Sequence, residues 1–289
     1  MENPGASRMA IESHYDVSND FYRLWLDPSL VYSAAMWQGD DTLDSAQQRK
    51  IDYHIAQSGA ARAKRVLDVG CGWGAVLKRL VTVHGVETAV GLTLSRAQAR
   101  WVEELHCPGV DVRVESWADH ESRDRYDAII SIGAFEHFAK ISHSDQEKVE
   151  GYRAFFECCH RWLKPGGRMS LQTFAYGSAI NRDQARTSRG TLFLADEIFP
   201  ETDPPRLADI ANAVVGTFEI ESLRNDHEDY ERTCRLWLQR LRQKRDDAIQ
   251  LVGDAIVSRY ERYLQLSTLG FKTQRLALYR LTLSRMGVR

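Results

Sequence analysis

Short apolar runs alternate with amphipathic stretches through the middle of this chain. The runs predict five buried strands, at residues 65–69, 86–92, 110–115, 126–131 and 168–174. After the first run, apolar positions at helical spacing form one face, which consists of Trp73, Val76, Leu77, Leu80 and Val81. Ser95 is a predicted N-cap for a helix through Leu105, and a helix over 145–163 ends at Lys164-Pro165-Gly166-Gly167. This rhythm predicts an α/β fold with a mostly parallel, doubly wound sheet.

The segments before and after this region have a different pattern, although we expect one folded domain overall. Residues 1–60 are helical in pattern and rich in aromatic residues, and we interpret them as a lid over a core at 61–175. Residues 176–270 contain a polar loop, a proline-rich turn and a long charged helix around 236–266, and are expected to cover a substrate. Residues 271–289 form a closing tail, in which a strand at 276–283 is predicted to close the sheet's edge.

Composition excludes several classes of protein. The 289 residues are 43% hydrophobic, which is enough for a sizeable core, and 38 Lys and Arg against 40 Asp and Glu give no overall attraction to nucleic acid. The five cysteines lack metal-ligand spacing, so we expect no metal and a reducing, cytoplasmic setting. Because no stretch approaches about 18 apolar residues, we expect no stable membrane insertion.

The first predicted strand runs into a glycine turn, Val66-Leu67-Asp68-Val69-Gly70-Cys71-Gly72-Trp73-Gly74. Such a turn opens a helix whose free N–H groups face a nucleotide-like ligand. A nicotinamide site needs a carboxylate about 20 residues on, and the strand over 86–92 ends without one. Asp68 can order the turn or meet the cationic amino group of S-adenosylmethionine (SAM). SAM is therefore the favoured ligand.

Four residues follow predicted strands and should line one crevice at the carboxyl edge of the sheet. They are Gly70, Thr93, Trp117 and Glu136.

Ordered motifs over residues 10–285 resemble the cyclopropane-fatty-acid synthase and mycolic-acid cyclopropane synthase family of SAM-dependent methyltransferases. The motifs are His14-Tyr15-Asp16-Val17-Ser18-Asn19-Asp20-Phe21-Tyr22, Tyr32-Ser33, the glycine turn, Gly91-Leu92-Thr93-Leu94-Ser95 with Gln98, Ser131-Ile132-Gly133-Ala134-Phe135-Glu136-His137-Phe138, Glu197-Ile198-Phe199-Pro200, and Tyr230 before Leu236-Trp237. The resemblance implies a Rossmann-like class I methyltransferase, with SAM as cofactor and S-adenosyl-L-homocysteine (SAH) as product.

The resemblance also implies which residues hold the cofactor. They are Tyr32, Ser33, Asp68, Gly70, Gly72, Gly74, Thr93, Leu94, Gln98 and Trp117. Thr93 and Gln98 would offer neutral hydrogen bonds to the ribose, and Trp117 a flat apolar face to the adenine. Ala118 stands where the family often has an acidic residue, so Asp119 or backbone would hold the adenine amino group.

In the family a bicarbonate ion removes the final proton, held by a cysteine loop, a glutamate, a strand histidine and a tyrosine. Glu136 and Tyr230 match as catalytic residues, but Ala34 and Gln172 replace the cysteine and the histidine. The sequence therefore leaves bicarbonate in doubt. We expect Glu136 to stabilise a cation or act as base, with Tyr230 assisting.

Aromatic faces around the substrate would stabilise such a cation. The candidates are Tyr15, Trp37, Phe135, Phe174 and Tyr176, and His14 is expected to orient the N-terminal lid while His137 is structural.

We interpret the chain as a C-methyltransferase acting on the carbon–carbon double bond of an apolar substrate. An isoprenoid side chain of a natural product is favoured over an acyl chain. Three alternatives stay open: a cyclopropane synthase on an unsaturated acyl chain, an amine N-methyltransferase and a non-catalytic SAM-binding scaffold. The oligomeric state also stays open.

Overall fold

The computed structural model describes residues 5–7, 9 and 17–287. Its centre is a seven-stranded sheet with the order β3-β2-β1-β4-β5-β7-β6. The strands are β1 (Arg65–Val69), β2 (Thr88–Thr93), β3 (Val110–Val114), β4 (Tyr126–Ile132), β5 (Leu163–Tyr176), β6 (Phe218–Asn225) and β7 (Leu276–Arg285). The first five strands run parallel, and β7 is antiparallel to both β5 and β6. The doubly wound, mostly parallel sheet that the sequence predicts is confirmed.

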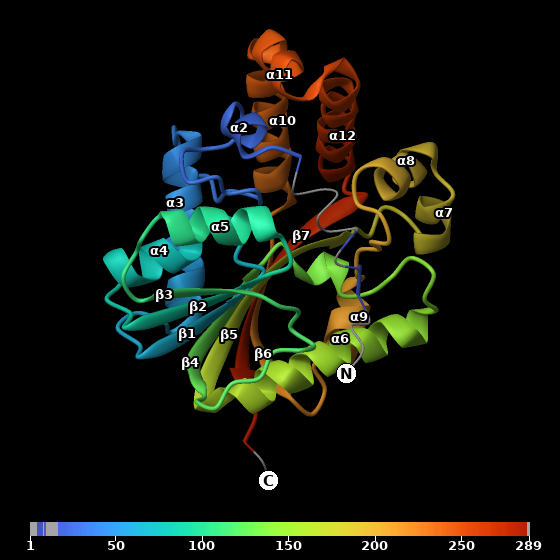
Figure 1. Ribbon diagram of the computed structural model, residues 1–289. Coiled ribbons are helices and arrows are strands. Elements are labelled where there is room, and N and C mark those ends of the chain that lie inside the picture. Colours follow the sequence, from blue (N-terminus) through green and yellow to red (C-terminus); the bar gives the residue numbers. More distant parts are fainter. Residues whose placement is uncertain (1–4, 8, 10–16, 288–289) are drawn as a thin grey trace.

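Helices cover both faces of the sheet (Figure 1). On one face lie α3 (Leu43–Ser58), α4 (Ala75–Thr82) and α5 (Arg96–Glu104), and on the other lie α6 (Asp145–Trp162) and α9 (Leu207–Ala213). Each face buries its own hydrophobic cluster, and the α6 side carries the larger one. This double cover explains why the central strands appear in the sequence as unbroken apolar runs.

The sequence signals that predict the start of α5 and the end of α6 are confirmed. The Ser95 hydroxyl accepts a hydrogen bond from the backbone nitrogen of Gln98 at 3.1 Å, so it caps α5 as expected. Helix α6 ends at Trp162, and β5 begins at once. The proline and glycines that follow lie in an irregular part of β5, where its register against β4 shifts.

The tail strand does not close the edge of the sheet, contrary to the sequence-based expectation. β7 lies between β5 and β6, and the edge strand is β6, which the sequence analysis missed. Phe218 is buried and Ile220 is half-buried, while Glu219 between them is exposed. An edge strand buries only one face, so its alternating pattern is weaker than the apolar runs of the parallel strands.

The expectation of a single long helix around 236–266 is also wrong. The structure has three helices there, α10 (His227–Gln243), α11 (Arg245–Val252) and α12 (Asp254–Lys272). Gly253 separates the last two with φ +83°, a conformation that ends a helix and favours glycine. Charged residues continue across both breaks, which hides them in the sequence pattern.

Helices from both ends of the chain meet above the carboxyl ends of the parallel strands (Figure 1). Short α2 (Asn19–Arg23) packs against α10 and α12 through an aromatic cluster that also contains Trp73 of the glycine turn. The Tyr22 and Trp73 rings lie 5.0 Å apart, and those of Trp25 and Trp237 lie 5.7 Å apart. His14 and Tyr15 lie outside the described residues.

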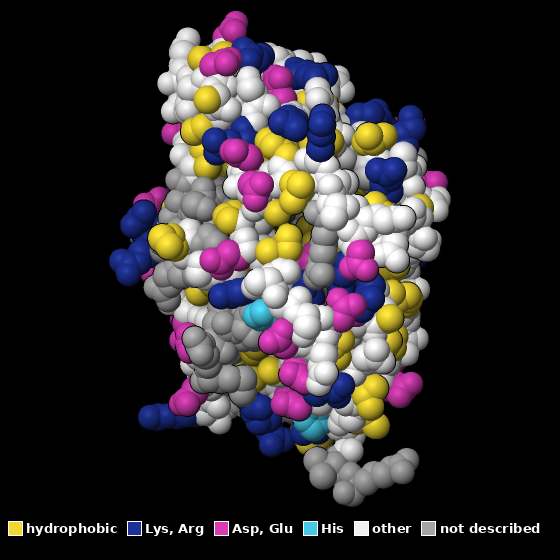
Figure 2. Space-filling view, turned by 90° about the vertical axis from the view of Figure 1, so that its right-hand side faces the viewer, with side chains coloured by type: hydrophobic (Ala, Val, Ile, Leu, Met, Phe, Trp, Pro, Cys, Tyr) yellow, Lys and Arg dark blue, Asp and Glu magenta, His cyan; other side chains and the backbone are white. Residues whose placement is uncertain are grey.

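Of two further helices, α8 (Arg189–Glu197) lies beside α12, and α7 (Arg182–Arg186) lies beside α8. Within the described part of the chain, no helix is both long and apolar enough to cross a bilayer. Figure 2 shows basic and acidic side chains mixed across the face that carries these helices, as the near-neutral net charge of −2 predicts.

Candidate functional site

The glycine turn after β1 is held by backbone geometry. The nitrogens of Gly70 and Cys71 both donate to the carbonyl of Leu92, at 3.0 Å each, which ties the turn to the end of β2. Gly70 has φ +86°, and a Cβ placed there would meet the Cβ of Ala134 at 2.4 Å. Only glycine therefore fits, and the turn's backbone faces an open cavity.

This cofactor cavity encloses about 1030 Å³, including its open mouth, which is at the upper end of the range for small-molecule sites. Its lining includes nine of the ten residues predicted to hold SAM: Tyr32, Ser33, Asp68, Gly70, Gly72, Thr93, Leu94, Gln98 and Trp117. Gly74 is not among the lining residues. It starts α4 with φ +80° and faces Val102 of α5, so its role is helix packing.

Several of the predicted cofactor residues contact one another. The Thr93 hydroxyl donates to Oε1 of Gln98 at 2.8 Å and accepts from the nitrogen of Ser95 at 3.1 Å. Trp117 is buried against Phe138 and Phe155, and it borders the cavity. Neighbouring side chains therefore fix the orientation of the lining.

A second cavity lies under α8, α10 and α12, and we call it the acceptor cavity. It encloses about 670 Å³. Its lining residues are mostly aromatic and aliphatic, and among those described none is charged: Phe174, Tyr176, Thr191, Leu194, Ala195, Phe199, Thr202, Pro204, Tyr230, Cys234, Tyr263, Ser267, Phe271 and Leu276. The rings of Tyr230 and Phe271 stack at 4.4 Å.

Glu136 lies in the wall between the two cavities. Its neighbours Ala134 and His137 line the cofactor cavity, and its Oε1 accepts from the nitrogen of Phe174, which lines the acceptor cavity, at 2.7 Å. Oε2 is buried without a hydrogen-bond partner among the described residues. Burial raises the pKa of Glu136 to about 7, although the hydrogen bond from Phe174 acts in the opposite direction. The carboxylate can therefore exchange a proton near neutral pH.

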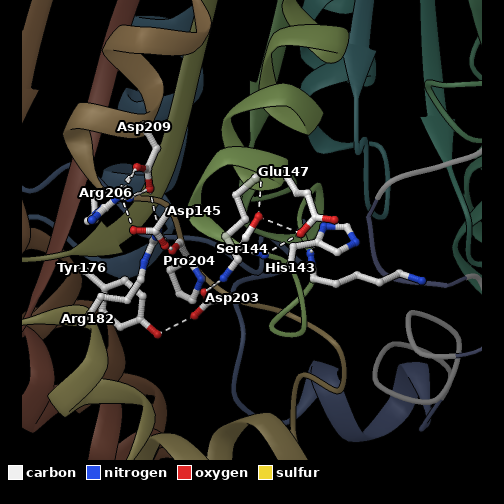
Figure 3. Close-up of polar contacts among 12 residues, drawn as sticks. His143, Ser144, Asp145, Glu147, Tyr176, Arg182, Asp203, Pro204, Arg206 and Asp209 are labelled. Atoms are coloured by element: carbon white, nitrogen blue, oxygen red, sulfur yellow. Dashed lines mark hydrogen bonds and ion pairs between the residues drawn. The ribbon is translucent and has the colours of Figure 1, made fainter.

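A cluster of ion pairs and hydrogen bonds includes Tyr176, which lines the acceptor cavity (Figure 3). Tyr176 lines the cavity and donates its hydroxyl to Oδ1 of Asp203 at 2.6 Å, and the other carboxylate oxygen of Asp203 pairs with Lys148. Arg182 at the start of α7 bridges Asp145 and Asp209. These pairs fix the segment that carries α7 and α8 against α6 and α9.

The residues that should hold a bicarbonate ion do not fit that role here. Oε1 of Gln172 accepts from Nε of Arg280 at 2.9 Å, and its Nε2 donates to the carbonyl of Ala34 at 3.4 Å. His54 also contacts Oε1 of Gln172, at 3.3 Å. The Gln172 amide is thus engaged by neighbours, and Ala34 carries no polar side chain. Of the four side-chain positions, Tyr230 lines the acceptor cavity, and Glu136 lines neither cavity but bonds the backbone of Phe174, which lines the acceptor cavity.

Two predicted substrate contacts are wrong. Phe135 lies in the hydrophobic core, where its ring stacks on that of Tyr152 of α6 at 4.5 Å. Trp37 packs on α10, where its Nε1 donates to the hydroxyl of Thr233 at 3.0 Å. Neither borders a cavity, and neither do Ala34 and Gln172, whereas Phe174 and Tyr176 do.

The sequence analysis missed several lining residues. Lys50 borders the cofactor cavity, although it is a lysine on the buried face of α3. Its spacing from Ala46 and His54, one helical turn on either side, would have placed it on that face. His137 also borders the cavity, so its interpretation as purely structural is incomplete; its Nδ1 bonds the hydroxyl of Thr202 at 2.8 Å.

Comparisons with known proteins agree with this geometry. A family model described as mycolic acid cyclopropane synthetase matches residues 3–281. Cyclopropane mycolic acid synthase MmaA2 of Mycobacterium tuberculosis is 34% identical over 269 residues, which are 88% of this chain and 89% of that protein. Cyclopropane mycolic acid synthase 1 of the same organism is 35% identical over 267 residues, or 88% and 89% of the two chains.

Among solved structures, mycolic acid cyclopropane synthase CmaA1 complexed with SAH and CTAB matches with a TM-score of 0.86 and 31% identity, covering 97% of this chain and 99% of that one. Fold and cofactor cavity thus define a SAM-dependent class I methyltransferase. The chain belongs to the mycolic acid cyclopropane synthetase family.

Proposed function

We propose that this enzyme transfers the methyl group of SAM to a carbon–carbon double bond of an unsaturated acyl chain and closes a cyclopropane ring. The observation that carries the proposal is the position of Glu136. Its unpartnered Oε2 lies in the wall between a cofactor cavity and an apolar cavity. The mycolic acid cyclopropane synthases to which the chain is similar support the acyl chain over the isoprenoid favoured by sequence alone.

The lining of the acceptor cavity supports an apolar substrate. Because none of its described residues is charged, it offers no cation for a diphosphate. The nucleophile of an amine N-methyltransferase is a nitrogen lone pair, so methyl transfer there leaves no carbocation for aromatic faces to stabilise. These features therefore argue against amine methylation, and they support a hydrocarbon chain.

SAM supplies an electrophilic methyl group and leaves as SAH. The double bond donates its electron pair to that methyl carbon as the sulfur–carbon bond breaks, and positive charge forms on the other alkene carbon. The faces of Phe174, Tyr230 and Phe271 border the cavity in which this charge would form. Glu136 opposes the charge and accepts, at Oε2, a proton from the transferred methyl, whose freed electron pair closes the ring.

A second candidate is C-methylation of an isoprenoid alkene without ring closure. The observation that favours it is the loss of the anion site, with Ala34 and Gln172 in place of the family's cysteine and histidine. Loss of a proton from a carbon other than the new methyl would then give a methylated alkene. The two candidates differ in which proton Glu136 removes.

Trideuteromethyl-labelled SAM distinguishes them. We would incubate the enzyme with a phospholipid carrying a cis-monounsaturated chain, the free fatty acid, a prenylated phenol and a secondary amine, and follow products by mass spectrometry and NMR. A cyclopropane retains two deuterium atoms, and a simple methylated alkene retains three. SAH release with the amine alone would overturn the proposal, and no turnover with the whole panel despite SAM binding would favour a scaffold.

A further inference from the structure

A buried arginine joins three segments that border the two cavities. Arg280 of β7 has no exposed surface, and each nitrogen of its guanidinium donates a hydrogen bond. Buried arginines are rare unless they are paired, and this one pairs with Asp226 and Asp229. A planar guanidinium holds several acceptors in a fixed geometry, which the flexible ammonium of a lysine does not. The partners of Arg280 are therefore fixed relative to one another.

The first segment is the strand that carries residues of the acceptor cavity. Arg280 lies directly opposite Gln172 in the antiparallel pair of β7 and β5, and its Nε donates to Oε1 of Gln172 at 2.9 Å. Alternate residues of a strand share a face, so Gln172 shares its face with Phe174 and Tyr176, which line the acceptor cavity. The backbone of Phe174 also bonds Glu136. Arg280 thus fixes the part of β5 that holds the proposed base.

The second segment is the first turn of α10. Nη1 of Arg280 pairs with Asp226, the residue before the helix, and with Asp229 at 3.0 Å. Tyr230 follows Asp229 directly and lines the acceptor cavity. A displacement of the guanidinium would therefore move Tyr230 relative to β5.

The third segment is the loop over residues 32–35, which we call the cofactor loop. Nη2 of Arg280 donates to the carbonyl of Ala35 at 2.8 Å, and Gln172 donates to the carbonyl of Ala34 at 3.4 Å. The first two residues of the loop line the cofactor cavity. One guanidinium thus connects a segment of the cofactor cavity to two segments of the acceptor cavity.

The proposed reaction depends on the separation of these segments. Reacting atoms must approach to about 3–3.5 Å, and a misplacement of about 1 Å can lower the rate on the order of 100-fold. Ring closure adds a second requirement, because the base must reach the transferred methyl and not another carbon beside the cation. Arg280 itself lines neither cavity, so any effect that it has on the reaction passes through its partners.

We propose that Arg280 is a positioning residue for methyl transfer and ring closure, which holds the cofactor loop, β5 and the first turn of α10 at the separation that the reaction needs. Gln172 then has a role of its own, because the residue that replaces the family's histidine connects Arg280 to β5. The inference rests on the proposed function, since it concerns which proton is lost after methyl transfer.

Product labelling with trideuteromethyl SAM separates positioning from stability. The ratio of two-deuterium to three-deuterium product does not depend on the folded fraction, because unfolded enzyme makes no product. In Arg280→Lys a single ammonium replaces the guanidinium and cannot hold all three segments. We expect turnover to fall about 10-fold or more and the ratio to fall about 3-fold or more. The SAM dissociation constant should change less than about 3-fold, because Gln47 and Lys50 also bond Ser33, at 2.9 and 2.8 Å.

Gln172→Met tests the bond to β5 while the buried charge and its two carboxylates remain. Methionine has a similar length but offers no comparable acceptor to Nε of Arg280, so the ratio should fall in the same direction and by less. Arg224→Met is the matched control and should keep the wild-type ratio. Arg224 also pairs with Asp226, but its side chain is 52% exposed and its guanidinium hydrogen-bonds Asp226 alone among the described residues.

A wild-type ratio in both Arg280→Lys and Gln172→Met would overturn the proposal, even if turnover were lower. An equal change of ratio in Arg224→Met would also overturn it, because the effect would then not be specific to the contacts of Arg280. Wild-type enzyme that makes only three-deuterium product would instead overturn the proposed ring closure. The ratio of double-bond isomers in that product would then test Arg280 with the same variants.

Discussion

The carboxylate of Glu136 and the backbone nitrogen of Phe174 are joined by a hydrogen bond of 2.7 Å that crosses the wall between the two cavities. The bond occupies Oε1 and leaves Oε2 as a buried acceptor. It also fixes Glu136 to β5, the strand that carries Phe174 and Tyr176 into the acceptor cavity. One backbone contact thus holds the proposed base beside the proposed substrate.

Glu136→Gln should abolish proton removal while leaving cofactor binding intact. The amide oxygen can still accept from Phe174, but the group can neither oppose a cation with full charge nor take a proton. We expect turnover to fall by about 100-fold or more, with the SAM dissociation constant changed less than about 3-fold. Radiolabelled methyl transfer and calorimetry would measure the two effects. A variant with full turnover would remove Glu136 from the mechanism.

The rate of methyl transfer should increase with pH and reach half its maximum near pH 7. The ionised form of Glu136 is the active one, and burial raises the pKa of this group to about 7, so the active fraction grows as pH rises through that value. His137 does not contribute, because burial lowers its pKa to about 4. Single-turnover rates at saturating SAM, from pH 5.5 to 8.5, would show the profile. A rate that falls over this range would contradict it.

A bulky residue at position 195 should block the acceptor cavity alone. Ala195 of α8 lines that cavity and is not among the residues that line the cofactor cavity. We expect Ala195→Phe to raise the substrate KM or abolish turnover, while SAM binds as in the wild type. Leu192→Phe on the exposed side of the same helix is the control, with Leu192 45% exposed. Equal activity of both variants would place the substrate elsewhere.

Gly70→Ala should unfold the glycine turn. The added Cβ would lie 2.4 Å from that of Ala134, and the residue would also hold φ +86°. We expect a loss of about 3 kcal/mol or more in unfolding free energy, with loss of SAM binding. Gly39→Ala is matched in backbone strain, with φ +54° and no atom within 4 Å. Its cost should be about 1 kcal/mol, and urea unfolding of both variants measures the difference.

Arg280 should be one of the most sensitive positions for stability. Its guanidinium is fully buried, pairs with Asp226 and Asp229, and donates to the carbonyl of Ala35 at 2.8 Å. Arg280→Met would leave these groups buried without their partner, which should lower the free energy of unfolding by about 3–5 kcal/mol. Arg224 also pairs with Asp226, but its side chain is 52% exposed, so Arg224→Met should cost less than about 1 kcal/mol. Similar urea midpoints for the two variants would contradict this.

The sequence alone determined the parallel half of the sheet and the cofactor turn. Strands buried on both faces are continuous apolar runs, and a turn that only glycine can adopt leaves a local signature. The helix cap at Ser95 and the glycine turn could therefore be predicted from neighbouring residues alone. The antiparallel edge does not, because β6 buries one face only and α10 to α12 continue one charged pattern across two breaks.

The tertiary structure decided which of the predicted residues share a site. Periodicity gave no means of telling that Phe135 packs on Tyr152 while Glu136, one residue later, lies between two cavities. Likewise Lys50 looks like an ordinary helix residue until α3 packs on the sheet and brings it to Ser33. Local sequence encodes backbone conformation and burial, whereas the meeting of distant side chains, and the pKa shifts that follow from it, depend on packing between elements far apart in the chain.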